Sequence, residues 1–367
     1  MAERLVIKIG SNVLTRADGT LDVTRMSALV DQIVRLRGLG YEIIVVSSGA
    51  VACGRSLVKK HGKLDSVEQR QLYSAVGQVR LINLYYSLFR DYGISIGQVL
   101  TMKESFATRK EYLNQRSCME VMLANGVIPI VNENDTVSVT ELMFTDNDEL
   151  SGLVASMMDA QNLVILSNID GIYDGDPADP ASKVIRRVEP DDDLSGYIRT
   201  GKSSFGRGGM LTKTSIAQKV ALEGIRVIIA TGKKDNILVD LAACLGGREN
   251  LTPALTPVFT EFVPAATPVS SVKKWIAHSE GFAKGAVTVN RNALKAITGN
   301  DAASLLLVGV TAVEGEFEEG DIIRILDEKG RAVALGKSSY SSAEVADNLG
   351  KHDLKPLVHY DYLYLNQ

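Results

Sequence analysis

Two lysines stand where their side chains could bind a phosphate group. Lys8 lies in the apolar run RLVIKIG (4–10), where a lysine is unusual, and Gly10 behind it lets a phosphate approach the backbone closely. Lys213 ends GRGGMLTK (206–213), which opens onto the helical pattern TSIAQKVALEG. Glycine-rich backbone at the amino end of a helix can hold an anion. The plain alternatives are a lysine that extends from a strand end to solvent, and an ordinary loop with a helix cap.

The stretch GYIRTGKS (196–203) matches the Walker A pattern of nucleotide triphosphatases letter for letter. That pattern needs a buried strand before it and a helix directly after it. The preceding residues, EPDDDLS (189–195), are too polar for a buried strand, and the following SSFGRGG is too rich in Gly and Ser to begin a helix. We therefore interpret the match as chance and assign no role to Lys202.

Two acidic stretches, NENDTV (132–137) and FTDNDELSG (144–152), could bind the molecule that accepts a phosphoryl group. Phosphoryl transfer needs cations around the moving group, a magnesium ion, and an anion wherever the acceptor carries an ammonium group. Asp135 and Asp148 could supply that anion, although Asp148 could equally cap a helix, and a metal-binding pair of carboxylates is a further alternative. No residue resembles a covalent nucleophile, which favours direct in-line transfer.

The elements that position these residues follow an alternating pattern. Short β-branched runs predict strands at 4–10, 41–49, 94–100, 127–134, 162–168 and 225–232. Between them, apolar residues at three- and four-residue spacing predict helices at 24–39, 68–92, 110–124 and 148–160. Such alternation predicts an α/β fold, an α/β/α sandwich around a mainly parallel sheet.

Five of these strands end in small or polar residues, among them Ser47-Ser48-Gly49-Ala50, Ser167-Asn168 and Ala230-Thr231-Gly232. Open parallel sheets bind ligands at the carboxyl ends of their strands, so five such endings favour a binding site over turn chemistry alone. Ser48 lies at a strand-to-helix turn without a His–Asp pair, which favours a hydrogen-bonding or capping role over a nucleophilic one.

The composition is that of a globular protein: 367 residues, 45% hydrophobic and 23% charged, with a net charge of −4. This charge gives no reason to expect binding to nucleic acid or to a membrane surface. Three widely spaced cysteines predict no disulfide framework and fit a reducing, cytoplasmic location. The four histidines form no zinc pattern, and no stretch predicts a signal peptide or a membrane span.

Near residue 252 the pattern changes. TPALTPVFTEFVPAATPVSS (252–271) holds four of the nine prolines and predicts a linker, and short alternating segments follow it. We therefore expect an α/β domain at 1–255, a linker at 256–271 and a small β-rich domain at 272–367.

The motifs KIGSNVLT, VVSSGAVACG, NENDTV, TDNDELS, LSNIDGIYDGDP and GRGGMLTK occur in this order. Together they resemble the glutamate 5-kinases of the amino-acid kinase family. The segment GEFEEGDIIRILDEKGRAVALGKSSY (315–340) is similar to a PUA domain. The resemblance covers nearly the whole chain, and the combination of NEND, DND and GGMxTK with a PUA tail is highly specific.

The resemblance implies ATP-dependent phosphorylation of the side-chain carboxylate of L-glutamate, the first step towards proline. It implies that Lys8 and Lys213 act on the phosphates and that Asp148 positions them. It implies that glutamate is held by Ser48, Gly49, Asp135 and Asn147. The nucleotide would contact Lys8, Gly10, Ser167, Asn168, Arg207, Gly208, Gly209, Met210, Leu211, Thr212 and Lys213.

Two positions depart from the family pattern. Asn168 stands where Asp is frequent, and Arg207 stands where a small residue is usual, so the nucleotide contacts differ in charge. The resemblance further implies that Mg²⁺ arrives with ATP, that proline inhibits the enzyme, and that the chain forms a homodimer or homotetramer.

Two rival interpretations remain open. One is a kinase of the same fold with another acceptor, such as aspartate, acetylglutamate, carbamate or a nucleotide. The other is an RNA-binding protein acting through the tail, because PUA domains commonly bind RNA. Residues 272–367 carry 11 Lys and Arg against 13 Asp and Glu, whereas an RNA-binding surface is usually basic. RNA is therefore the less favoured partner.

Overall fold

The chain folds into two compact units in a computed structural model. The first unit is Met1–Ser105 with Leu113–Pro268, and the second is Phe106–Tyr112 with Val269–Gln367. The structure describes residues 2–59, 62–137, 147–194, 210–244, 256–266, 270–299 and 303–365.

The first unit alternates strands with helices along the chain. Its strands are β1 (Glu3–Ile9), β2 (Tyr41–Val46), β3 (Ile96–Thr101), β4 (Ile128–Glu133), β5 (Asn162–Ser167), β6 (Arg187–Val188), β7 (Arg226–Thr231) and β8 (Phe259–Phe262). Its helices are α1 (Ser11–Leu14), α2 (Val23–Gly38), α3 (Ala50–Leu57), α4 (Ser66–Arg90), α5 (Arg109–Ala124, which begins in the second unit), α6 (Asn147–Met157), α8 (Met210–Leu222) and α9 (Ile237–Cys244).

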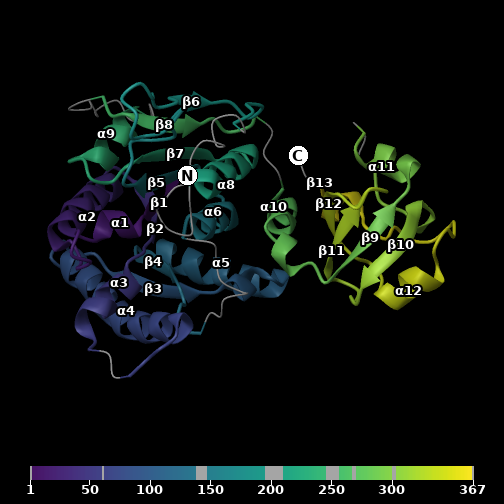
Figure 1. Ribbon diagram of the computed structural model, residues 1–367, viewed down its shortest axis with the longest axis horizontal. Coiled ribbons are helices and arrows are strands. Elements are labelled where there is room, and N and C mark those ends of the chain that lie inside the picture. The colour runs from purple at the N-terminus through teal and green to yellow at the C-terminus, as the bar shows by residue number, and fades with distance from the viewer. Residues whose placement is uncertain are drawn as a thin grey trace. The chain divides into compact units, whose positions relative to one another are not determined.

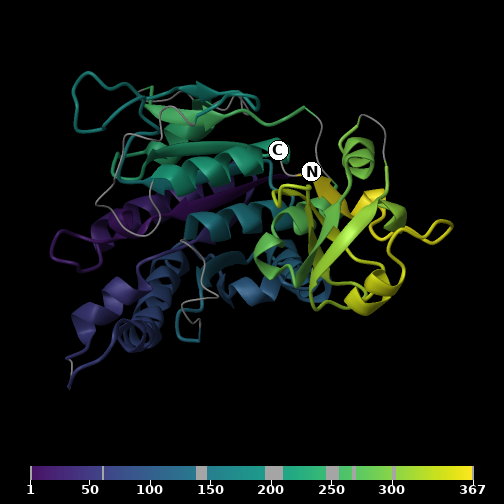
Figure 2. The same cartoon turned by 45° about the vertical axis from the view of Figure 1, so that its right-hand side comes forward.

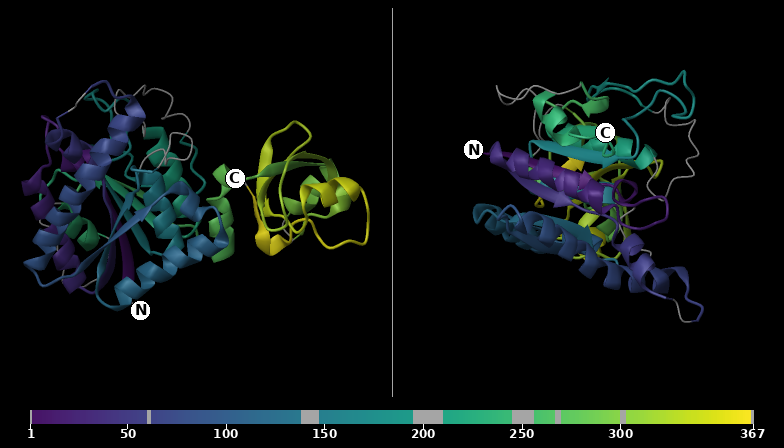
Figure 3. Two further views of the ribbon diagram at one scale, coloured as in Figure 1. Left: turned by 90° about the horizontal axis from the view of Figure 1, so that it is seen from below. Right: turned by 90° about the vertical axis from the view of Figure 1, so that its left-hand side faces the viewer.

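These strands form one eight-stranded sheet in the order β3-β4-β2-β1-β5-β7-β8-β6. The six strands from β3 to β7 are mutually parallel, and β8 joins β7 in the antiparallel sense. Figure 1 shows α2 and α9 on one side of the sheet and α6 and α8 on the other, and the left panel of Figure 3 shows the strands between these helical layers. The predicted sandwich with a mainly parallel sheet is confirmed.

The alternation of side chains along β1 determines where Lys8 points. Successive side chains of a strand face opposite sides of the sheet. Leu5, Ile7 and Ile9 belong to the apolar core that includes residues of α2 and α9. Lys8 therefore faces the other side, where α6 packs against β1.

Helices α3 and α4 cross in close contact because glycines stand at the crossing. A Cβ atom on Gly77 would lie 1.8 Å from the Ala50 carbonyl oxygen, and one on Gly54 would lie 1.8 Å from that of Tyr73. No larger residue fits unless the backbones separate. Gly49, the N-cap of α3, has φ +95°, a conformation that glycine adopts without strain.

The second unit is built on a five-stranded sheet in the order β10-β9-β11-β12-β13. Figure 2 shows its strongly twisted strands with α12 beside β10. The strands are β9 (Gly285–Val289), β10 (Val310–Gly315), β11 (Ile322–Leu326), β12 (Ala332–Lys337) and β13 (Leu363–Leu365). The helices are α10 (Ser271–Ala277), α11 (Arg291–Ile297) and α12 (Ser342–Asp347). The predicted β-rich tail is confirmed.

The stretch 256–271, expected to be a linker, contains an element of the first sheet. Phe259–Phe262 forms β8, with Thr260 and Phe262 buried. The Thr260 hydroxyl accepts from the Ile172 N–H at 2.8 Å and donates to the Ile185 carbonyl at 2.6 Å. Four alternating residues between prolines were too short a pattern to predict a strand.

The three cysteines are free, with Cys53 buried and Cys118 and Cys244 exposed. A search of the described ranges finds no helix long and apolar enough to cross a membrane.

Candidate active site

The carboxyl ends of β1, β2, β4, β5 and β7 lie at one edge of the sheet, because these strands are parallel. The polar residues at the strand endings are therefore brought to one region, as expected for an open parallel sheet. Two groups of contacts form there, one around Asp148 and one around Asp135.

Asp148 joins Lys8 and Lys213, the two lysines expected to bind phosphate. It lies in the first turn of α6 and is fully buried. One carboxylate oxygen pairs with Nζ of Lys8 from β1, and the other pairs with Nζ of Lys213 from α8. The side chains of Lys8 and Lys213 are only 7% and 14% exposed. Among the described residues, the two lysines that pair with this one carboxylate give the cluster a positive character that suits an anionic ligand.

The ionisation of Asp148 depends on its two partners. Burial would raise the pKa of the carboxyl group, but the charges and hydrogen bonds of Lys8 and Lys213 outweigh burial and hold the pKa below its ordinary value of 3.8. The carboxylate therefore stays charged at neutral pH and keeps the ammonium group of each lysine beside it.

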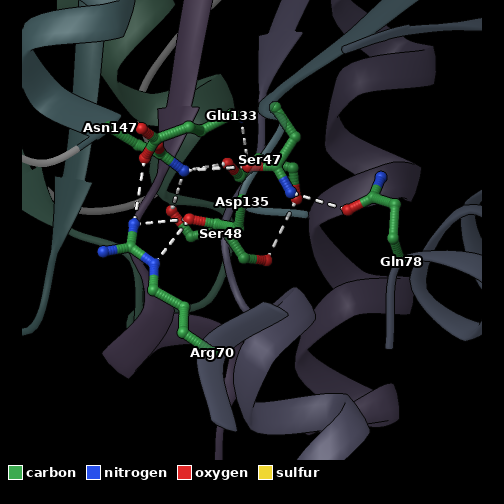
Figure 4. A network of polar contacts seen from close by, with 8 residues as sticks. Ser47, Ser48, Arg70, Gln78, Glu133, Asp135 and Asn147 are labelled. Atoms are coloured by element: carbon green, nitrogen blue, oxygen red, sulfur yellow. Dashed lines mark hydrogen bonds and ion pairs between the residues drawn. The ribbon is translucent and has the colours of Figure 1, made fainter. Parts of the chain in front are cut away.

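Asn147, the residue before Asp148, connects α6 with the ends of β2 and β4. Its Nδ2 lies 2.6 Å from the Ser47 carbonyl oxygen and 3.0 Å from both Ser48 Oγ and Asn132 Oδ1. Figure 4 shows Asn147 pointing towards Ser47 and Ser48. The amide thus fixes the strand-to-helix turn at Ser48 and Gly49 beside the Asp148 cluster.

Asp135 follows β4 and is paired with an arginine of α4. The Arg70 Nε donates to Asp135 Oδ1 at 2.7 Å, and Nη2 of the same guanidinium contacts both Asp135 and Glu133, the latter at 3.1 Å. Figure 4 shows this guanidinium between the two carboxylates. Burial raises the pKa of the Asp135 carboxyl above its ordinary value of 3.8, and Arg70 and Ser74 only partly offset that effect.

On the side expected to bind nucleotide, Gly10 keeps the end of β1 close to β5. Its N–H donates to the Leu166 carbonyl oxygen at 3.0 Å, and a Cβ at Gly10 would lie 3.0 Å from that oxygen. Ser167 ends β5, and its hydroxyl donates to the Asn168 side chain at 3.3 Å. Thr212 and Lys213 lie in the first turn of α8, which begins with Met210 and Leu211.

Some predicted residues lie outside the described residues. They are Arg207, Gly208 and Gly209, together with the Walker A match at 196–203. The interpretation of the Walker A match as chance therefore stays a prediction, and so do the expected nucleotide contacts of Arg207, Gly208 and Gly209.

Two residues of α4 take part in these contacts although no sequence motif pointed to them. One is Arg70, and the other is Gln78, whose Oε1 accepts from Asn132 Nδ2 at 2.8 Å. Both were missed because polar residues on a long helix are usually solvated. The available signal was their spacing: Arg70, Ser74 and Gln78 recur every four residues and so share one face of α4.

Comparison with known families identifies the class of protein. The model of the amino acid kinase family matches residues 3–231, and that of the PUA domain matches residues 285–359. The chain belongs to the amino acid kinase family, a family of enzymes, and carries a C-terminal PUA domain. The resemblance inferred from the sequence motifs is confirmed.

Individual relatives are similar along the full chain. The glutamate 5-kinase of Bacteroides thetaiotaomicron is 64% identical over 362 residues, 99% of this chain and 98% of that protein. The glutamate 5-kinase of Chlorobaculum tepidum is 46% identical over 364 residues, 99% of this chain and 97% of that protein.

Among solved structures, carbamate kinase from Giardia lamblia bound to AMP-PNP superposes with a TM-score of 0.52 at 14% identity. The match covers 72% of this chain and 99% of the carbamate kinase. At that level of identity the likeness shows a shared fold alone.

Proposed function

We propose that this protein transfers the γ-phosphoryl group of ATP to the side-chain carboxylate of L-glutamate, the first step of proline biosynthesis. The observation that carries the proposal is the fully buried Asp148, which pairs with Lys8 and Lys213 next to the Asn147–Ser48 contacts. The full-length relatives named glutamate 5-kinase, 64% and 46% identical to this chain, support glutamate as the acceptor.

In the proposed reaction, a side-chain carboxylate oxygen of glutamate attacks the γ-phosphorus. The bond from that phosphorus to the β,γ-bridging oxygen breaks, so that L-glutamyl 5-phosphate and ADP form without a covalent enzyme intermediate. Lys8 and Lys213 stabilise the charge on the phosphoryl oxygens. Asp148 contributes by keeping their ammonium groups in place, because a misplaced cation stabilises the transition state less.

The acceptor would be held from the other side of the cluster. Ser48 and Gly49 offer a hydroxyl group and a backbone amide for its carboxylates, and Asn147 holds this turn in place through its contacts with Ser47 and Ser48. Asp135 offers a carboxylate to its ammonium group, and pairing with that group would favour the charged form of Asp135.

The Mg²⁺ ion would enter as part of the substrate complex with ATP. No group of three or more His, Cys, Asp or Glu side chains within the described ranges is arranged to hold a metal ion. Both Asp148 oxygens are paired with lysines. Mg²⁺ commonly keeps several waters and relies on substrate phosphates, and this site fits that mode.

The proposal extends to regulation and assembly. Proline, the end product of the pathway, would raise the glutamate concentration needed for half-maximal rate, and the chain would act as a homodimer or homotetramer. Unchanged glutamate kinetics at millimolar proline would contradict the regulatory part.

The test of the reaction is acceptor-dependent ADP release with ATP and Mg²⁺, run with glutamate, aspartate, N-acetylglutamate and UMP. Activity on glutamate alone is expected, and it should be lost in Lys213→Ala. Lys219→Ala, on the same helix α8, is the matched control and should remain active. Activity on another acceptor would retain the fold and refute glutamate as the substrate.

A further inference from the structure

One face of α4 supports the acceptor side of the site. Arg70, Ser74 and Gln78 lie four residues apart and so project in one direction from the helix. Their contacts run to the end of β4: Arg70 and Ser74 to Asp135, and Gln78 to Asn132. The close crossing at Gly54 and Gly77 joins α4 to α3, which begins directly after Gly49.

Arg70 is the charged member of this face. Its side chain is 27% exposed, whereas those of its partners Glu133 and Asp135 are 4% and 10% exposed. The two carboxylates come from positions two residues apart in the chain and share this one guanidinium. A pair of carboxylates at this place suits an acceptor that carries an ammonium group.

We propose that Arg70 is a positioning residue for the phosphoryl acceptor: its guanidinium bridges Glu133 and Asp135 and keeps Asp135 ionised and oriented to receive the ammonium group of the substrate. A planar guanidinium can contact two carboxylates at once, which a lysine does less well. Arg70 thus acts through Asp135 and not on the reacting atoms. The inference rests on the proposed function, because it requires an acceptor that carries an ammonium group.

The consequence is a pH dependence that appears when Arg70 is removed. Among the described residues, Arg70 of α4 is the charged group facing Asp135, Ser74 of α4 donates a hydrogen bond to it, and Glu133 of β4 shares the guanidinium. The pKa of Asp135 is already raised by burial with Arg70 present. Loss of Arg70 raises it further and leaves Glu133 as a repelling charge, so Asp135 is protonated at a higher pH.

The experiment compares the wild type with Arg70→Gln, Arg70→Lys and Arg80→Gln, the last being an exposed arginine on the same helix. The KM for glutamate, the KM for ATP and kcat are measured between about pH 6 and about pH 8.5, with calorimetric glutamate binding in the absence of ATP.

For Arg70→Gln, the glutamate KM is expected to rise at least about tenfold at the acidic end and to approach the wild-type value as pH rises. The KM for ATP and kcat should change less than about twofold. Arg70→Lys keeps the charge, so its KM should be intermediate with a flat pH profile. Arg80→Gln should match the wild type.

Several results would overturn the inference. They are an Arg70→Gln variant equal to the wild type, a KM increase of the same size at every pH, and equal losses for glutamate and ATP. Should Arg70→Gln not fold, an unchanged glutamate KM in Arg70→Lys would overturn it. A wild type that neither binds glutamate nor releases ADP with it refutes the proposed function itself, and this inference with it.

Discussion

Asp148 has each carboxylate oxygen paired with a different lysine, one from a strand and one from a helix. The buried Asp148 carboxylate is tolerated because an ammonium group pairs with each of its oxygens. The two lysines, in turn, are tolerated in the interior because this carboxylate neutralises part of their charge. Under the proposed function the same contact would serve both folding and chemistry, and a substitution there should reveal both.

Asp148→Asn keeps the size of the side chain and removes its charge. Without the anion, Lys8 and Lys213 repel each other and no longer hold their positions on the phosphoryl group, so kcat is expected to fall by about 10²–10³-fold. The measurement is glutamate-dependent ADP release at saturating substrates. Glu149→Gln, the next residue of α6, is the control and should stay within about twofold of the wild type. Equal activity in the two variants would contradict a positioning role for Asp148.

The same variant carries a prediction for stability against pH. The folded-state pKa of Asp148 is lowered from 3.8 because of its two lysines, which outweigh burial. A lowered folded pKa gives stability that is present above the unfolded pKa and lost as pH falls through the folded one. The gap in urea midpoint between wild type and Asp148→Asn should therefore be large near pH 7 and shrink below about pH 4. A difference in urea midpoint that does not change with pH would contradict a charged Asp148 carboxylate in the folded protein.

At the scale of elements, the α3–α4 crossing sets where Ser48 and Asp135 lie relative to each other. Gly77→Ala places a Cβ 1.8 Å from the Ala50 carbonyl oxygen, so the two helices must separate. The expected loss is about 2–3 kcal/mol in the free energy of unfolding, together with a higher glutamate KM. Gly38→Ala, where a Cβ meets nothing within 4 Å, is the matched control and should be neutral or stabilising by about 0.5 kcal/mol. Similar values for both variants in urea unfolding would contradict a tight crossing.

The elements that sequence patterns located best are those buried on both faces. Runs such as VIKI and NLVILS are continuous and β-branched, so β1 and β5 were predicted to within a residue or two. β6 and β8 were missed because two and four residues carry too little periodicity. Their pairing with the sheet depends on tertiary contacts that no local pattern encodes.

In the candidate site, too, local sequence signals point to some residues, whereas others depend on tertiary packing. The structure brings Lys8, Asp148 and Lys213 together. Local signals had singled out each of them: a charge inside an apolar run, an acidic stretch before a helix, and a lysine behind glycines. Arg70 was not found, because which face of α4 points inward depends on how the helix packs against β4. Residues that act through a partner element are therefore the ones that sequence motifs miss.

At the scale of the whole molecule, the division into units does not follow the order of the chain. Phe106–Tyr112, which follows β3, groups with the C-terminal unit. Within that unit the Trp275 Nε1 donates to the Phe106 carbonyl oxygen at 3.1 Å, and the Arg109 guanidinium lies 5.1 Å from the centre of the Tyr112 ring and 5.9 Å from that of Trp275. Removal of residues 269–367 would thus take Trp275 away from Phe106 and Arg109.

The boundary itself can be tested with two shortened chains, one ending at residue 255 and one at residue 268. Both lack Trp275 and the PUA domain, so they differ in the segment that contains β8. The shorter chain leaves the β7 edge unpaired and loses the burial of Phe262, which is 1% exposed. We expect it to melt at least about 5 °C below the longer chain in a thermal unfolding scan. Equal melting temperatures would mean that β8 adds nothing to the first unit, and that 256–271 behaves as the linker that its prolines predicted.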